Sequence, residues 1–272
     1  MIVDIHIHTQ SAGCRYDPRE VGECIRLARR AGIDRAVWLF NLADSGGYDP
    51  APVDVRRSND LGIALASAHP DFFLGFCYLN PAHDPAFNAA EIDRCVAAGP
   101  LRGIKLWVAV RATDARLDPL LARAAVLGVP VLHHAWYKAT GQLPQESTPA
   151  DIADLARRHP RVPIIMAHLG GGGWRGVQDI KACPNVVIDT SGAQPQAGLV
   201  EYAVRELGAR RVLFGSDWPL RDFAAQRARV EGAGLSARDR ALVLGGNAAR
   251  LLPALRMPVG PRETRREACG AL

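Results

Sequence analysis

Two histidines stand one residue apart in the opening segment "MIVDIHIHTQ", at positions 6 and 8. The segment predicts a β-strand, because its apolar residues are closely spaced and mostly β-branched. Side chains alternate between the two faces of a strand, so His6, His8 and Asp4 point to the same side. A pair of imidazoles on one strand face is consistent with a polar surface, with catalysis, or with half of a metal site.

Further side chains of chemical interest lie near the ends of other apolar segments that we expect to be strands. They are Lys105 in "GIKLWV", His133 and His134 in "PVLHHAW", His168 in "PIIMAHL" and Asp217 in "VLFGSD". Successive members are separated by whole numbers of roughly 24–34-residue steps, the size of one strand–helix unit. Imidazole and carboxylate groups are ligands that suit Zn²⁺ or a similar divalent ion. Converging at one point, these residues would form a metal site.

The elements that must position these residues alternate regularly along the chain. We expect eight strands, at 2–8, 35–40, 72–79, 103–108, 130–136, 163–169, 186–191 and 212–217. We expect helices at 18–31, 54–68, 86–98, 117–127, 149–158, 175–182, 197–207, 221–233 and 237–252. Strict alternation implies a parallel sheet, and eight units favour a closed (β/α)8 TIM barrel, whose active sites lie at the C-terminal ends of the strands.

The barrel is expected to be a single domain over residues 1–255, followed by a loose C-terminal tail over 256–272. An open, doubly wound α/β sheet is the alternative. It is disfavoured because neither GxGxxG nor GxxxxGK[ST] follows the first strand.

Composition excludes several classes of partner. The formal net charge is +5, but the basic residues are scattered along the expected helices, so we expect no nucleic-acid surface. None of the six cysteines forms a CxxC pair, which favours reduced thiols and a cytoplasmic location. We expect no signal peptide, and no apolar run approaches the roughly 20 residues that cross a bilayer. The partner is then a small-molecule substrate, and a homodimer is one option for the assembly.

Lys105 interrupts an apolar strand, and lysine is rarely buried without a partner. It could pair with a nearby acid or contact a substrate. Alternatively, its amine could be N-carboxylated to a carbamate that bridges two metal ions. Carboxylation needs an amine pKa lowered by burial and by nearby cations.

Taken in order, the segments "DIHIH", "GIKL", "PVLHHA", "AHLGG", "NVVIDTSG" and "VLFGSDWP" resemble the amidohydrolase superfamily, specifically its amidohydrolase-2 branch. The resemblance runs from residue 2 to about 252 and implies a TIM barrel with one or two metal ions, Zn²⁺ or Mn²⁺. It implies that His6, His8 and Asp217 bind the first ion. By the same resemblance, His134 is the strand-five ligand, whereas His133 faces away and is structural.

His168 matches a position that binds a second metal in binuclear relatives and acts as a general acid/base in mononuclear ones. Lys105 stands where some relatives place a bridging acidic ligand, which favours two ions if it is carboxylated. The favoured activity is hydrolysis of an amide, lactone or ester by metal-activated water. In that reaction Asp217 carries the proton and His168 assists catalysis.

Two other functions remain open. Some members of the branch carry out non-oxidative decarboxylation of small aromatic or dicarboxylic acids with the same ligands. A barrel that binds metal without catalysis is the third possibility. For substrate binding, Trp107, Trp136, Tyr137 and Trp174 lie just beyond expected strand ends, where aromatic rings could stack on a planar substrate. Arg15 and Arg175 are the candidates for holding a substrate carboxylate.

Overall fold

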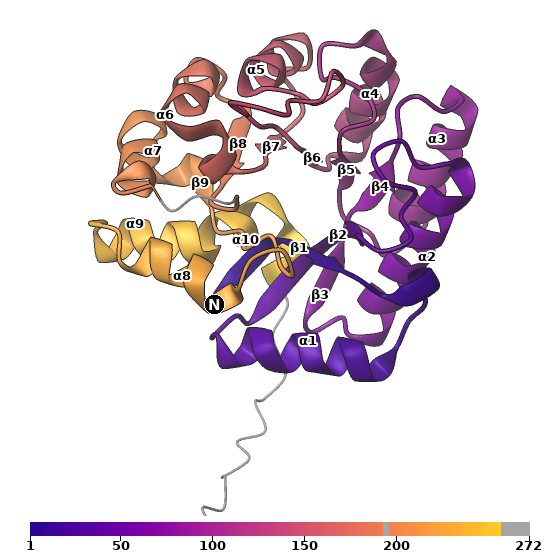
Figure 1. The fold of residues 1–272 in the computed structure, drawn as a ribbon, viewed down its shortest axis with the longest axis horizontal. Coiled ribbons are helices and arrows are strands. Elements are labelled where there is room, and N and C mark those ends of the chain that lie inside the picture. The colour runs from indigo at the N-terminus through magenta and orange to yellow at the C-terminus, as the bar shows by residue number, and fades with distance from the viewer. Residues whose placement is uncertain (193–195, 257–272) are drawn as a thin grey trace, which may run out of the picture.

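Parallel strands follow one another around a ring, and the helices lie outside it (Figure 1). The computed structural model describes residues 1–192 and 196–256. Within these ranges the strands are β1 (Val3–Thr9), β2 (Arg35–Asn41), β3 (Phe73–Gly75), β4 (Cys77–Leu79), β5 (Ile104–Leu106), β6 (Val131–His133), β7 (Ile164–Met166), β8 (Val186–Asp189) and β9 (Val212–Leu213). The predicted (β/α)8 barrel is confirmed, and the open sheet is not found. The predicted tail, from residue 257 onward, lies outside the described residues.

One predicted strand is divided in two. The segment 72–79 forms β3, which pairs with β2, and β4, which pairs with β5. Phe76 lies between them, and its N–H still donates to the Trp38 carbonyl at 2.9 Å. The barrel therefore has eight strand positions, as predicted, because β3 and β4 together occupy one position: β3 pairs with β2 on one side and β4 pairs with β5 on the other.

The ring closes between the first and the last strand. The Ile5 N–H donates to the Phe214 carbonyl at 2.9 Å, and the Asp217 N–H donates to the His6 carbonyl at 2.8 Å. A parallel bridge joins Ile7 to Trp218. The chain after β9 is thus tied to β1, which brings Asp217 beside the two histidines of β1.

The helices are shorter than predicted in places, and three begin earlier: α2, α3 and, by the largest margin, α6. They are α1 (Pro18–Arg30), α2 (Pro52–Ala68), α3 (Pro85–Ile92), α4 (Asp118–Leu127), α5 (Pro149–Arg158), α6 (Leu169–Ile180), α7 (Leu199–Leu207), α8 (Phe223–Glu231), α9 (Ala237–Ala241) and α10 (Asn247–Leu251). Six of these α-helices, α1 to α5 and α8, begin at or directly after an aspartate, threonine or proline, the residues that favour a helix N-terminus. Helix α6 begins directly after β7, so the glycines 170–173 belong to its first turns.

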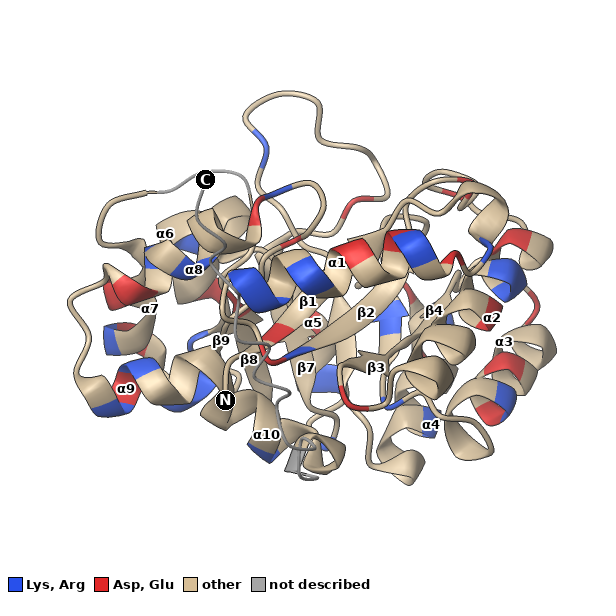
Figure 2. Cartoon of the chain, turned by 90° about the horizontal axis from the view of Figure 1, so that it is seen from below, with Lys and Arg blue, Asp and Glu red and all other residues tan. Residues whose placement is uncertain are grey.

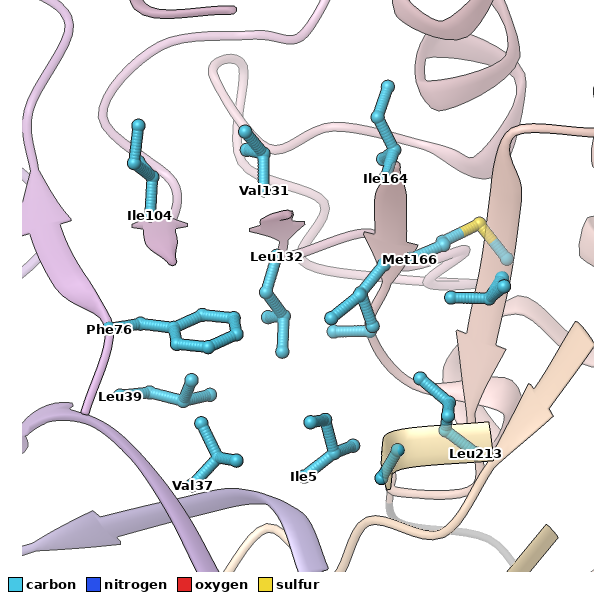
Figure 3. Close-up of a cluster of buried hydrophobic side chains, with 14 of the residues drawn as sticks. Ile5, Val37, Leu39, Phe76, Ile104, Val131, Leu132, Ile164, Met166 and Leu213 are labelled. Carbon is cyan, nitrogen blue, oxygen red and sulfur yellow. The ribbon is translucent and has the colours of Figure 1, made fainter. Parts of the chain in front are cut away.

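The core has two layers, because the strands are buried on both faces. Ile5, Leu39, Phe76 and Leu132 gather in the space that the strands enclose, whereas Ile104, Val131 and Ile164 lie on the helical side (Figure 3). All seven side chains are buried. This packing holds the strand ends, and the polar residues on them, in place.

Charged side chains are spread over the outer helices. In Figure 2 lysine and arginine are interspersed with aspartate and glutamate on α1 and α9. Among the described residues, no helix combines the length and the apolar character needed to cross a membrane.

Candidate metal centre

The six side chains predicted to bind metal line one cavity of about 310 Å³ at the C-terminal ends of the strands. They are His6 and His8 of β1, Lys105 of β5, His134 after β6, His168 after β7, and Asp217 after β9. Each is less than a tenth exposed. The barrel therefore brings together residues that are spread over more than two hundred positions.

The first donor group consists of His6, His8 and Asp217. The Nε2 atoms of the two histidines lie 3.2 Å apart. Asp217 Oδ1 lies 3.4 Å from His6 Nε2 and 3.6 Å from His8 Nε2. Two ligands of one Zn²⁺ ion at usual bond lengths are about 3–3.5 Å apart, so these three atoms have the spacing of a shared ion.

The outward-facing nitrogen of each imidazole is held by another group. His6 Nδ1 is 2.8 Å from Asp189 Oδ2, His8 Nδ1 is 3.1 Å from the Phe40 carbonyl, His134 Nε2 is 2.8 Å from Glu146 Oε1, and His168 Nδ1 is 2.8 Å from Ser191 Oγ. Such partners fix the ring and its tautomer in metal sites. A carbonyl or carboxylate can only accept, so the histidine nitrogen donates and the other nitrogen keeps its lone pair.

The inward-facing nitrogens, each with a free lone pair, consequently lie in two close pairs. One pair is His6 and His8, and the other is His134 Nδ1 and His168 Nε2, which are 3.1 Å apart. Ser191 Oγ donates to Asp189, which leaves it free to accept from His168 Nδ1. Two lone pairs at this distance cannot hydrogen-bond to each other, whereas a cation beside them would satisfy both. The residues present therefore fit a divalent metal ion.

The protonation states agree with metal binding. Burial lowers the pKa of His6, His8, His134 and His168, which favours the neutral imidazole that binds a metal. Burial acts in the opposite direction on Asp217, but the neighbouring His8 and His6 hold the pKa of its carboxyl below the usual value.

A second group of three donors is His6, His168 and Asp189, whose ligand atoms lie within 4.8 Å of one another. Among the described residues, His134 belongs to neither group of three, and its inward nitrogen lies beside that of His168. The arrangement has room for one ion on the first group, with His134 and His168 as a neighbouring pair of donors.

Lys105 lines this cavity, and the carboxylates of Asp189 and Asp217 are close enough to act on the charge of its amine. Its side chain is buried, and its Nζ lies 5.7 Å from the centre of the Phe40 ring. Among the described residues, no carboxylate oxygen lies within 4 Å of this amine, so the predicted salt bridge is not found. Burial lowers the pKa of Lys105 to about 8. Contact with a substrate and carboxylation both remain predictions.

His133 is buried, and its Nδ1 lies 2.7 Å from the His134 carbonyl. It does not line the cavity of the metal-binding residues.

The predicted substrate-binding residues are distributed over two cavities. Trp107 and Trp136 line the 310 Å³ cavity. Tyr137 and Trp174 line a neighbouring cavity of about 770 Å³, which also includes Trp136. Arg15 lies at neither cavity: it is exposed in the first loop, and its side chain lies over Gly13. A long arginine in an exposed loop can fold back along its own chain, which the sequence pattern does not reveal.

Four residues of the site were missed by the sequence analysis. Asp189, the last residue of β8, holds His6, and Ser191 holds His168. Applying the strand-end rule to "VVIDTS" would have found Asp189. Glu146 lies in a loop, and Arg221 follows Asp217 by four positions and lines the cavity. Neither of these two stands at a strand end, so nothing in the sequence marks them.

Comparisons with known proteins identify the family of this chain. The sequence model of the family described as Amidohydrolase matches residues 3–254. A gamma-resorcylate decarboxylase of Polaromonas sp. is 27% identical over 287 residues, covering 84% of this chain and 85% of the relative. An L-fucono-1,5-lactonase of Burkholderia ambifaria is 28% identical over 251 residues, covering 82% and 81%.

A solved structure shares the fold. It is a dihydroxybenzoic acid decarboxylase from Polaromonas sp. with bound manganese and the inhibitor 2-nitroresorcinol. It superimposes with a TM-score of 0.71 at 21% identity, covering 92% of this chain and 96% of that one.

Proposed function

We propose that this chain, which belongs to the amidohydrolase family, is a metal-dependent enzyme that removes carbon dioxide from a small aromatic acid without oxidation. Four of the curated relatives are decarboxylases of gamma-resorcylate, and one is a lactonase. The expectation from sequence placed hydrolysis first and decarboxylation second. The relatives and the charges of the cavity support the reverse order.

The observation that carries this proposal is the excess of positive charge in an aromatic-walled cavity. Lys105 and Arg221 line it, and among the described residues neither forms an ion pair with a carboxylate. Within the described part of the chain, the Arg221 guanidinium donates to the neighbouring Leu220 carbonyl, at 2.6 Å, and to no other group. The walls include the rings of Phe40, Tyr48, Trp107 and Trp136. A planar anion fits such a cavity better than a neutral sugar lactone.

His6, His8 and Asp217 would hold the metal ion, and His134 and His168 would complete the set or hold a second ion. Zn²⁺ and Mn²⁺ both suit these ligands, and Mn²⁺ is the first to test because a structural relative contains manganese. When bound, the ion supplies a positive charge that orients and polarises an oxygen of the substrate.

The chain's own residues supply the other parts of the reaction. The bond between the ring carbon and the carboxylate breaks, carbon dioxide leaves, and the ring carbon takes a proton. We assign the proton transfer to Asp217: its carboxylate first takes a proton from solvent water and then passes it to the ring carbon, and the hydroxide left in solvent combines with the released carbon dioxide as bicarbonate. His168 Nε2 is the supporting polar group. The Lys105 amine holds the substrate carboxylate, and the aromatic side chains exclude water.

The direct test is an assay of the manganese-loaded and zinc-loaded protein with 2,6-dihydroxybenzoate, 5-carboxyvanillate and L-fucono-1,5-lactone. We expect release of carbon dioxide from at least one acid and loss of this activity in Asp217→Asn. Turnover by Asp217→Asn at the wild-type rate would contradict the role of Asp217. Hydrolysis of the lactone with no turnover of either acid would contradict the proposed reaction.

Hydrolysis of a lactone is the second candidate, and the lactonase relative favours it. The same donors would bind the metal, and Asp217 would pass a proton from water to the leaving oxygen. A barrel that binds metal without turnover of any of the three compounds would fit the non-catalytic alternative.

A carboxylated Lys105 would carry a negative charge instead of a positive one. Intact mass measurement of the metal-loaded protein separates the two forms, because the carbamate adds the mass of one carbon dioxide. Under the proposed function we expect the unmodified amine.

A further inference from the structure

A second cavity of about 770 Å³ adjoins the metal cavity. The two share Trp136 and Lys138 as lining residues. The larger cavity lies along the loop after β6 and the first turns of α6, and it is lined further by Tyr137, Trp174 and Arg175. A molecule seated at the metal residues could therefore extend past Trp136 into the larger space.

Trp136 is held as a wall between the two spaces. Its ring centre lies 5.1 Å from that of His168, and the backbone N–H of Trp136 donates to the Ser147 carbonyl at 3.0 Å. A Cβ atom on Gly171 would approach the ring to 2.5 Å, so the absence of a side chain there lets the indole occupy its position. The shared wall presents an aromatic surface next to both cavities.

Arg175 brings a positive charge to the larger cavity without a matched acid. Its guanidinium carbon lies 4.4 Å from the centre of the Tyr137 ring. That ring is itself fixed, because the Tyr137 hydroxyl donates to Asp179 Oδ2 at 2.6 Å and its N–H donates to the Gly171 carbonyl at 3.0 Å. Among the described residues, the Arg175 guanidinium forms no hydrogen bond or ion pair, so its donors are free.

The other cation of this cavity is already paired. Lys138 Nζ lies 2.8 Å from Glu146 Oε2, and the same carboxylate holds His134. None of the described residues that line the larger cavity is acidic. The cavity thus carries the unbalanced charge of Arg175, on a guanidinium whose planar donors match a carboxylate.

We propose that the larger cavity binds a second anionic group of the substrate, with Arg175 as the residue that recognises it. This proposal rests on the proposed function, since it assumes that a first carboxylate sits at the metal residues. The substrate class is then an aromatic acid that carries another carboxylate on a short extension, and Trp136 lies along the connecting part.

The test is calorimetric binding to the manganese-loaded protein. The probes are benzoates with a second carboxylate in the para position, attached through a chain of one, two or three carbons. Each diacid is compared with the compound in which this second carboxylate is a methyl ester. We expect the diacid to bind about tenfold more tightly than its ester for at least one chain length. Arg175→Gln should abolish this difference and leave the ester affinity within about twofold, while Arg175→Lys should restore part of it.

Arg205→Gln is the matched control. Arg205 also stacks on a tyrosine, at 4.9 Å from the centre of the Tyr202 ring, but it lines neither cavity. We expect it to leave the preference for the diacid unchanged. Equal affinities of diacid and ester at every chain length, or an unchanged preference in Arg175→Gln, would overturn this inference and leave the proposed function standing. Failure of both probes to bind would overturn it together with the proposed function.

Discussion

Each histidine of the candidate metal centre has its two ring nitrogens in different surroundings. One nitrogen is fixed by a carboxylate, a carbonyl or a hydroxyl, and the other faces the cavity. The partners come from β2, β8 and the loop before α5, so three separate parts of the chain orient the four rings. At the scale of single residues, we therefore expect metal affinity to depend on the groups that hold the rings as well as on the nitrogens that face the cavity.

The first prediction concerns Asp189, which accepts from His6 Nδ1 at 2.8 Å. Asp189→Asn should weaken Mn²⁺ binding by about 10- to 100-fold, because the amide no longer supports the tautomer and basicity of His6. Competition with a fluorescent chelator measures this affinity. Asp118→Asn is the control: Asp118 accepts from His159 Nε2 at 2.7 Å, outside the cavity. Equal losses in both variants would contradict the role of Asp189.

The second prediction concerns Arg221, which lines the metal cavity without an acidic partner among the described residues. Arg221→Gln should raise KM for the aromatic acid by about tenfold and lower kcat less, because the guanidinium binds the carboxylate in the ground state. Steady-state kinetics of carbon dioxide release measure both constants. Arg238→Gln, on α9, should change neither, and an unaltered KM in Arg221→Gln would remove this residue from substrate binding.

At the scale of elements, the junction of β7 and α6 determines the shape of both cavities. His168 ends the segment after β7 with φ +73°, and α6 starts at the next residue. The first turns of the helix carry glycines instead of side chains. Trp136, from the loop after β6, lies against Gly171 in the space that this leaves. The close contact between loop and helix places the aromatic wall beside His168.

The third prediction is that Gly171→Ala displaces this wall. The new Cβ would meet the Trp136 ring at 2.5 Å, so the ring or the helix must shift. We expect a loss of about 1–3 kcal/mol in the free energy of unfolding, measured by chemical denaturation, and a clear fall in kcat/KM. Gly22→Ala in α1 has open space around the new atom and should be neutral or stabilising. Wild-type activity in Gly171→Ala would contradict the role of the wall.

At the scale of the whole molecule, the candidate metal centre lies across the closing seam of the barrel. β9 contains two residues, and few backbone hydrogen bonds join β1 to the segment after it. His6 and His8 stand on one side of this seam and Asp217 on the other. An ion held by all three would bind the first strand to the last, and would stabilise the folded chain by mass action.

The fourth prediction is therefore a rise in Tm on loading with Mn²⁺ or Zn²⁺. At a free metal concentration of about 100 Kd, we expect roughly 5–10 °C, measured by differential scanning calorimetry. A chelator should reverse the rise. His8→Ala should abolish most of it, whereas His159→Ala should retain it because His159 lies outside both cavities. A Tm independent of metal would contradict the metal centre.

The sequence by itself determined the order of the strands and helices, and it showed that the polar residues lie at the C-terminal ends of the strands. Strict alternation of apolar and amphipathic segments predicted the barrel, because a parallel sheet of eight such units can bury both faces by closing. The barrel then implied that His6, His8, Lys105, His134, His168 and Asp217 converge, since strand ends meet at one rim. These inferences depend on periodicity and on strand direction, which are local properties of the chain.

Only the tertiary structure decided which residues surround that rim. It placed Glu146 behind His134 and Arg221 in the cavity, left Arg15 outside, and paired Lys138 while Lys105, among the described residues, formed no ion pair. Loops carry no periodic pattern, so the path of a loop and the direction of a long side chain depend on the packing of distant segments. The charge of the cavity is the sum of such placements, and for that reason the proposal of an anionic substrate rests on the folded molecule more than on the sequence.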